Sequence, residues 1–224
     1  MLFLRENRLS REIAKALALS CLFLLPSAAA GAEASWANTL LNRWRATALL
    51  ETLNAEILAS SSATVSLEKW CGAHGLANPP RLVAEKVEGA SKPLSPEQRR
   101  RLGVGPDEPV RYRHVRLRCG GHVLSEADNW YLPSRLTPEM NRALETTDAP
   151  FGRVVRPLGL WRRTFEAKVL WSPLDSPGDA ASLAPPEGLF EHRAVLYTKD
   201  DLPFSVVDEI YRRDALDFPP GSAQ

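Results

Sequence analysis

The spacing of hydrophobic residues along the chain predicts three helices. In the first, apolar side chains recur every three to six positions from Trp36 to Ile57, as on one face of an amphipathic helix. The other two begin where a serine or threonine precedes a proline, because the hydroxyl caps the helix and the proline fits its first position. The expected helices cover residues 35–59, 95–101 and 137–145.

Alternating apolar and polar residues predict strands in most of the remaining segments. Two such runs face each other across Gly120-Gly121, which indicates a hairpin. The expected strands cover residues 64–70, 81–87, 110–119, 123–131, 160–171, 190–198 and 204–211. Short turns join consecutive strands, and the helices concentrate at the start and in one middle insertion. The pattern therefore predicts an α+β fold with a single, mainly antiparallel sheet and helices on one side.

The first 32 residues have the pattern of a secretory signal peptide. Four basic residues precede the apolar run 16–25, and Ala30-Gly31-Ala32 follows it at the spacing of a cleavage site. A run of about ten apolar residues is half of what a membrane-spanning helix needs, so we expect no stable anchor after cleavage. We predict a signal peptide at 1–32, a mature domain at 33–224, and a periplasmic or secreted location.

Composition and charge narrow the classes of function. The chain has 224 residues, of which 44% are hydrophobic and 25% charged, as is typical of a globular domain. Its formal net charge of +1 does not provide the basic surface of a nucleic-acid-binding protein, so no nucleic-acid partner is expected. The sequence contains no nucleophile elbow, phosphate-binding loop, dinucleotide-binding glycine motif or zinc-protease helix motif.

Export would leave two cysteines, Cys71 and Cys119, in an oxidising compartment. A pair of cysteines there tends to form a disulfide, and that is the favoured reading. Each cysteine is followed three positions later by a histidine, His74 or His122, so the four side chains offer a tetrahedral zinc site as an alternative. Unpaired thiols are the third alternative. We expect no metal and no cofactor.

Two arginines fall on the apolar faces of predicted strands. Arg113 alternates with apolar residues in the run 110–119, and Arg163 does so in the run 160–171. A buried guanidinium keeps its proton, so it needs an anionic partner in the fold or an anionic ligand. Asp208, on the apolar face of the last strand, is a candidate partner within the protein.

Five short motifs follow one another in a fixed order. They are Arg113-His-Val115-Arg-Leu117, then Ala127 with Tyr-Leu-Pro133, Ala-Pro150-Phe151-Gly152-Arg153, Arg163-Thr-Phe165-Glu166, and Leu-Pro203 with Glu209-Ile-Tyr211. In this order they resemble the chorismate lyase family, whose fold is shared by the effector-binding domains of GntR-type repressors. The resemblance covers about residues 45–216. It implies a six-stranded antiparallel sheet with helices, closed over an internal ligand pocket.

The resemblance also implies an activity. The family cleaves chorismate to 4-hydroxybenzoate and pyruvate without metal or cofactor, so we expect a cofactor-independent carbon–oxygen lyase acting on chorismate or a related enolpyruvyl aromatic acid. Carried over by motif, the carboxylate-binding arginine falls on Arg113. The turn whose main-chain amide holds the ligand carboxylate falls on Phe151 and Gly152, and an apolar pocket residue of the first helix falls near Leu53.

The catalytic acid is left open between two neighbours. The glutamate-x-aromatic pattern places it at Glu209, which we favour, whereas counting from Pro203 places it at Asp208. Such an acid can assist proton transfer as the bond to the enolpyruvyl group breaks. Arg163 would then face the second carboxylate of the substrate.

Export argues against a direct transfer of the activity, because chorismate is a cytosolic metabolite in the family's usual pathway. The same fold also serves as a non-catalytic sensor, so the alternative is a periplasmic binding or sensor module for a small aromatic or organic carboxylate. A third hypothesis is an accessory protein of the cell envelope with a vestigial cleft. In each case we expect a monomer.

Overall fold

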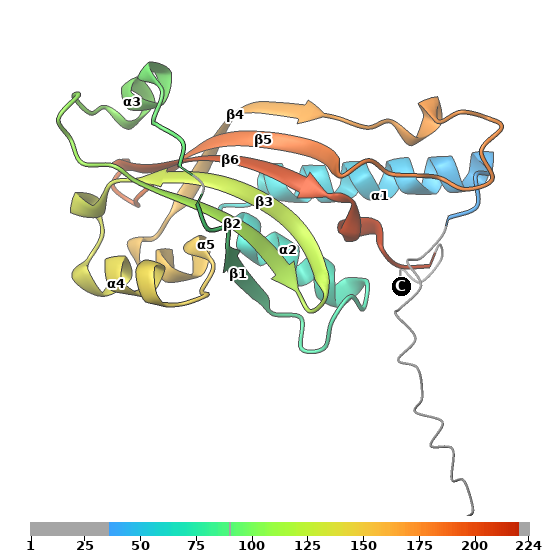
Figure 1. The fold of residues 1–224 in the computed structure, drawn as a ribbon, viewed down its shortest axis with the longest axis horizontal. Helices are drawn as coiled ribbons and strands as arrows, with labels where there is room; N and C mark the ends of the chain where they lie inside the picture. The colour runs from blue at the N-terminus through green and yellow to red at the C-terminus, as the bar shows by residue number, and fades with distance from the viewer. Residues whose placement is uncertain (1–35, 90, 220–224) are drawn as a thin grey trace, which may run out of the picture. The chain divides into compact units, whose positions relative to one another are not determined.

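Six strands form one antiparallel sheet in the computed structural model, which describes residues 36–89 and 91–219 (Figure 1). In chain order they are β1 (Leu82–Lys86), β2 (Arg111–Cys119), β3 (His122–Tyr131), β4 (Trp161–Val169), β5 (Gly188–Tyr197) and β6 (Pro203–Arg212). Across the sheet their order is β1-β2-β3-β6-β5-β4, so β1 and β4 are the edges. The predicted α+β class with a single antiparallel sheet is confirmed.

A tight turn fixes the register of the β2–β3 hairpin. Gly120 has a φ of +58°, a left-handed conformation that glycine adopts without steric cost, and a Cβ there would lie 2.8 Å from the Cβ of Ala77. The hairpin expected about Gly120-Gly121 is therefore confirmed. Alternation along β2 sends Arg113, Val115 and Leu117 to the same buried face.

Two helices, α1 (Leu40–Ala59) and α2 (Ala63–Ala73), cover one face of the sheet (Figure 1). Their apolar sides and the facing strands form the main hydrophobic core, in which Leu53 and Phe190 are almost completely buried. The N-cap of α1 is Thr39, whose hydroxyl accepts the amide hydrogen three residues further on. The helix therefore begins a turn later than its hydrophobic spacing predicts.

The other helices are short. They are α3 (Pro96–Leu102), α4 (Pro138–Thr146) and α5 (Phe151–Val154), with 3-10 turns at Pro133–Arg135, Arg156–Leu158, Pro173–Asp175 and Arg213–Leu216. The predicted caps of α3 and α4 are confirmed, since Ser95 forms a capping box with Gln98 and Thr137 caps α4. α3 packs on the face of the sheet opposite to α1, where Leu102 and Val206 belong to one hydrophobic cluster.

The strand expected at 64–70 is wrong, because these residues belong to α2. The segment alternates over a few positions, but its buried apolar residues also recur at helical intervals, at Ala63, Leu67, Trp70 and Cys71. A run this short fits both periods. Contact with the sheet and with α1 selects the helix, since one side of α2 then enters the main core.

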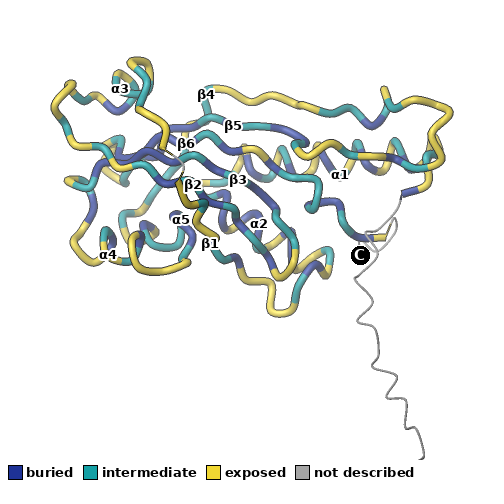
Figure 2. The backbone as a smooth tube through the Cα atoms, in the orientation of Figure 1, coloured by how far each residue is buried: buried dark blue, intermediate teal, exposed yellow. Residues whose placement is uncertain are grey.

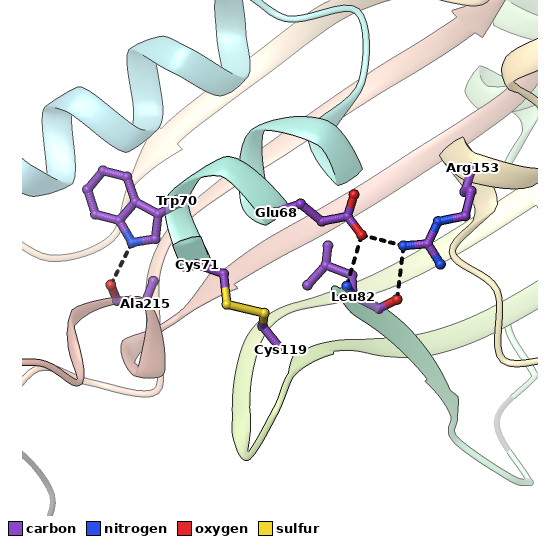
Figure 3. Close-up of a disulfide and its surroundings, with 7 residues drawn as sticks. All are labelled: Glu68, Trp70, Cys71, Leu82, Cys119, Arg153 and Ala215. Atoms are coloured by element: carbon purple, nitrogen blue, oxygen red, sulfur yellow. Dashed lines mark hydrogen bonds and ion pairs between the residues drawn. A yellow bond between two sulfur atoms is a disulfide. The ribbon is translucent and has the colours of Figure 1, made fainter. Parts of the chain in front are cut away.

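The end of α2 is tied to the sheet and to the C-terminal segment. A disulfide joins Cys71 to Cys119 at the end of β2, with an S–S distance of 2.08 Å (Figure 3). The two sulfur atoms that a zinc site would need are thus bonded to each other. The neighbouring Trp70 donates its indole N–H to the carbonyl of Ala215 at 2.8 Å (Figure 3).

The two ends of the described chain meet beside this disulfide. Trp36 donates its indole N–H to the carbonyl of Phe218 at 2.9 Å, and the two rings pack edge to face. The predicted signal peptide at 1–32 lies outside the described residues. Within the described ranges, none of the helices combines the length and the apolar character that crossing a membrane requires.

Candidate functional site

A pocket lies between the helix-covered face of the sheet and the segment that joins α1 to α2. The residues that line it include Arg113, Asn129, Phe151, Gly152, Arg162 and Glu209. Much of the remaining wall is apolar, from Val115 and Val207 on the strands to Leu160. The cavity has a volume of about 50 Å³, which holds about three or four water-sized groups.

Arg113 is a buried cation without a counter-ion among residues 36–89 and 91–219. The residue is 7% exposed, and its Nη2 donates to the carbonyl of Ala149 at 3.2 Å. Its Nε and Nη1 are buried and find no hydrogen-bond acceptor in the described part of the chain. Burial lowers the pKa of Arg113, yet a guanidinium stays protonated under any ordinary condition. The pocket therefore contains a positive charge with unused donors.

A second arginine in the pocket is neutralised. Arg162 donates from Nη1 to Oε2 of Glu209 at 2.5 Å, and both side chains are more than nine-tenths buried. The hydroxyl of Tyr211 donates to the same carboxylate oxygen at 3.1 Å. Burial alone would lower the pKa of Arg162, but Glu209 and Tyr211 raise it above its ordinary value. Glu209, the one carboxylate among the described lining residues, is thus already paired.

Arg162, rather than Arg163, is the inward arginine of β4. Arg163 is exposed on the opposite face, the one that carries α3. Trp161 and Phe165 lie on that face too, where Trp161 stacks on Tyr197 and Phe165 lies under the guanidinium of Arg101. Their apolar character made this face look like the buried one in the sequence. The predicted substrate-binding role of Arg163 is therefore not supported by its position.

Sequence reasoning missed Arg162 because its face looked entirely polar. On a regular strand Arg162, Thr164, Glu166 and Lys168 would share one side. The pairing of β4 with β5 shifts by one residue between Thr164 and Glu166, so Glu166 and Lys168 turn to the other face. No feature of the sequence marks this bulge.

The structure separates the two candidate acids. Glu209 faces the pocket, whereas Asp208 lies on the other face of β6, opposite Asp128 and close to Arg193. Burial raises the pKa of Asp208 to about 6. Leu53 packs in the main core and is 1% exposed, and it is not among the residues that line the pocket.

Phe151 and Gly152 line the pocket as the motif predicts, at the start of α5. A Cβ on Gly152 would lie 2.8 Å from Oγ1 of Thr64 and 2.9 Å from Oγ of Ser62, so glycine allows α5 to approach α2 this closely. Glu68 of α2 holds the two segments together (Figure 3). Its carboxylate pairs with Arg153 and accepts the backbone N–H of Leu82.

The first turn of α2 forms the opposite wall of the pocket. Ser61, Ser62, Ala63 and Thr64 all line it, and the side chain of the N-cap Ser62 makes no capping hydrogen bond. The first amides of a helix lack intrahelical partners and carry a partial positive charge. With Arg113 on the facing strand, this end of the pocket is suited to an anion.

Metal ligands are not gathered in the same way. Among residues 36–89 and 91–219, no group of three or more histidine, cysteine, aspartate or glutamate side chains is placed to hold a metal ion.

Comparison with known proteins finds one strong likeness in sequence. The chain is 49% identical over 197 residues to the uncharacterized protein y4mC of Sinorhizobium fredii, covering 84% of this chain and 83% of that one. No protein-family model matches the chain. The resemblance to chorismate lyase therefore stays a prediction.

Likenesses among solved structures are distant, and several of the matched proteins are described as transcriptional regulators. PhnF from Mycobacterium smegmatis aligns with a TM-score of 0.45 and 20% identity, over 72% of this chain and 68% of that one. YydK from Bacillus subtilis, described as a possible regulator, gives 0.40 and 18%, over 75% and 86%. The ligand-binding domain of a protein classed in the GntR family, from Bordetella bronchiseptica, gives 0.40 and 20%, over 60% and 84%.

Proposed function

Because the chain belongs to the same family as the uncharacterized protein y4mC, whose name states no activity, we propose a function from the pocket alone. The protein binds a small organic carboxylate there and acts as a binding module. We propose further that it does so after export, since the basic, apolar and small-residue regions of residues 1–32 follow the order of a signal peptide.

The observation that carries this proposal is the unused charge of Arg113. Two of its nitrogens are buried and find no acceptor in the described chain, and the pocket's carboxylate is already paired with Arg162. An unpaired buried charge costs free energy in the empty protein. A carboxylate ligand offsets that cost by accepting from Arg113 while lying near the first turn of α2.

Charge and donors narrow the class of ligand. Arg113 and Arg162 carry +2 and Glu209 carries −1, so the described pocket has a net charge of +1, which a monoanion balances. Nη2 of Arg162 is also buried without an acceptor. A neutral oxygen, such as a hydroxyl or a carbonyl, satisfies it without adding a second charge. We therefore propose a hydroxy or keto monocarboxylate.

The size of the cavity ranks the candidates. Because about 50 Å³ holds only a few water-sized groups, a small hydroxy acid requires the least movement of the walls. An aromatic acid such as 4-hydroxybenzoate requires the walls to move. Ser61, between α1 and α2, is the exposed residue among those that line the described pocket, so this connection is the part of the wall that can yield.

Calorimetry of the purified protein tests the proposal. The panel contains lactate, benzoate, 4-hydroxybenzoate and the uncharged 4-hydroxybenzamide, titrated into wild type, Arg113→Met and the control Arg163→Met. We expect a carboxylate to bind wild type and the control equally, and Arg113→Met to lose about 2–4 kcal/mol of binding free energy. Binding of the amide as tightly as its acid, or equal affinity in all three proteins, would reject the carboxylate site.

Lyase activity is a second candidate, because Glu209 and Arg113 line one pocket, as the resemblance to chorismate lyase implies. The ion pair with Arg162 works against it, since a carboxylate held by a guanidinium is a poor proton donor. Release of pyruvate from chorismate, followed with wild type and Glu209→Gln, decides between the two. Turnover by wild type that Glu209→Gln abolishes supports the lyase, and ligand binding without pyruvate supports the binding module.

A further inference from the structure

The outer edge of β4 has no backbone partner in the described chain. β4 pairs with β5 on one side, and its residues make no other backbone hydrogen bond within residues 36–89 and 91–219. Figure 1 shows it at the margin of the sheet, and its second half is exposed (Figure 2). Unpaired N–H and C=O groups along an edge are a ready template for another strand.

The opposite edge of the sheet, formed by β1, is short and covered by another segment of the chain. β1 has only five residues, and the N–H of Ala84 on its outer side donates to the carbonyl of Asp148 at 2.6 Å. The segment before α5 thus covers that edge. β4 has nine residues and no comparable cover in the described chain. A strand of this length is long enough to support a full antiparallel pairing.

The side chains of β4 on the face that carries α3 follow a self-complementary order. On the face that carries α3, the strand presents Trp161 and Arg163 before the bulge, and Glu166 and Lys168 after it. An aromatic ring and a cation thus precede Thr164, and an anion and a cation follow Phe165, the residue at the bulge. When two copies of this strand pair antiparallel, each cation therefore lies beside an anion or an aromatic ring of the other copy.

We infer that β4 pairs with the β4 strand of a second copy of this chain, antiparallel and about a two-fold axis at Thr164, so that two sheets join into one. The inference replaces the monomer expected from the sequence. It concerns the backbone edge of β4 and the face that carries α3, whereas Arg162 of the same strand faces the pocket on the other side, so it does not depend on the proposed function.

The register follows from the bulge. With Phe165 as the extra residue, Thr164 lies opposite the partner's Thr164, and Arg163 lies opposite the partner's Glu166. Trp161 then lies opposite the partner's Lys168, within reach of a cation–π contact. Each pair occurs twice by symmetry, as in any two-fold interface. In this register the paired residues also share a face of the sheet, as antiparallel pairing requires.

The unused charges of β4 favour this partner over an unrelated strand. Arg163 and Lys168 form no ion pair with any described residue. Glu166 reaches Arg193 at 3.2 Å, but both side chains are more than 40% exposed, so this contact is weak and Glu166 can accept a second guanidinium. A second copy supplies an anion for each free arginine.

Lysines and bulges on edge strands usually discourage association. Here the side chains before Thr164 lie opposite groups that attract them when two β4 strands pair antiparallel. They therefore favour one register with a second copy of this chain and disfavour other strands. One strand pair forms a small interface, at the weak end of specific protein contacts. The dimer is therefore expected to depend on concentration and on salt.

Sedimentation velocity of the purified full chain over a concentration series from about 1 μM to about 500 μM tests the inference. The variants are Arg163→Glu and Glu166→Arg, each of which places like charges opposite each other in both symmetric pairs. Both positions are exposed, so the fold is kept, and circular dichroism checks it. Arg142→Glu on the exposed side of α4 is the matched control for the change in net charge of Arg163→Glu.

We expect wild type and Arg142→Glu to dimerise alike, and each β4 variant alone to dimerise at least about tenfold more weakly. A mixture of Arg163→Glu with Glu166→Arg restores the dimer, because both pairs become opposite in charge again. Three results would overturn the inference: a wild type that stays monomeric throughout the series, variants that dimerise like wild type, or a mixture that stays monomeric.

Discussion

Arg162 donates to Glu209 across the intervening strand β5 at 2.5 Å, and this pair decides which charge in the pocket is left for a ligand. The charge of the Glu209 carboxylate is neutralised by Arg162 within the protein. Arg113, two strands away from Glu209, faces the same cavity, and no described residue supplies it with an anion. The end of the pocket at Arg113 can therefore bind an anion, whereas at the other end Arg162 and Glu209 neutralise each other.

Breaking that pair is expected to destabilise the fold. In Arg162→Met, Glu209 keeps a buried charge without its cation, so the free energy of unfolding falls by about 3–5 kcal/mol. Adding Glu209→Leu removes the orphaned charge, and most of the loss is recovered. Urea denaturation of the two single variants and the double variant measures both effects. A double variant as unstable as Arg162→Met would contradict the account.

Arg113 is expected to behave in the opposite way. Since no described residue pairs with its charge, Arg113→Met raises the free energy of unfolding of the ligand-free protein by about 1 kcal/mol or more. The same variant loses the rise in melting temperature that a bound carboxylate gives wild type. Thermal denaturation with and without ligand shows both effects. A variant less stable than wild type would indicate that Arg113 is paired in a way this structure does not contain.

Sequence patterns predict local structure correctly where a residue type strongly favours one backbone geometry. The glycine turn at Gly120 and the caps Ser95 and Thr137 specify local geometry by themselves, and the structure has them as expected. Arg113 was also found this way, because β2 is regular and alternation along it is reliable.

The rest of the site depends on contacts between distant segments. Alternation in β4 fails at the bulge near Thr164, which exchanges the faces and hides Arg162. The contribution of Thr64 could not be seen either, because α2 takes its helical form from the core that it enters. Where a short segment fits both the helical and the strand period, its packing in the fold determines its secondary structure, and a single sequence does not reveal that packing.

Stability below neutral pH is expected to depend on His192. This side chain is fully buried, and burial, together with Arg162, lowers its pKa from 6.5 to about 4. A lowered pKa means that the unfolded chain binds the proton first. The contribution of His192 is therefore complete above pH 6.5 and is lost as the pH falls toward 4, by about 3 kcal/mol.

Urea denaturation at pH 7 and at pH 4.5 measures this dependence. His192→Gln should lose clearly less stability between the two pH values than wild type does. Asp208→Asn is the matched control of opposite sign. Because burial raises the pKa of Asp208 to about 6, its contribution is largest at low pH and is lost as the pH rises through 6. Its removal should make the acid loss steeper, and a parallel response of the two variants would refute both assignments.

The disulfide is expected to be a large contributor to stability. It closes a loop between residues 48 positions apart, which in the chain-entropy account stabilises the fold by about 4 kcal/mol. The double variant Cys71→Ala/Cys119→Ala should unfold at a correspondingly lower urea concentration. Dithiothreitol should lower the midpoint of wild type toward the same value and leave the double variant unchanged. An effect of the reductant on the double variant would point to another cause.

Export predicts a defined N-terminus. We expect the mature protein to begin at or near Glu33 and to be recovered from the periplasm, as N-terminal sequencing and intact mass would show. Recovery from the cytosol with residues 1–30 still attached would contradict export. It would also return chorismate to the list of accessible substrates.

The contact between Trp36 and Phe218 makes the path of the described chain nearly a closed ring. A short linker between these two ends would complete the ring, and a new opening at the exposed turn residues 106–107 would give a circularly permuted chain with all six strands, the disulfide and both arginines in place. The pocket is therefore a property of the arrangement in space, and the order in which the segments are synthesised is free to change without altering it.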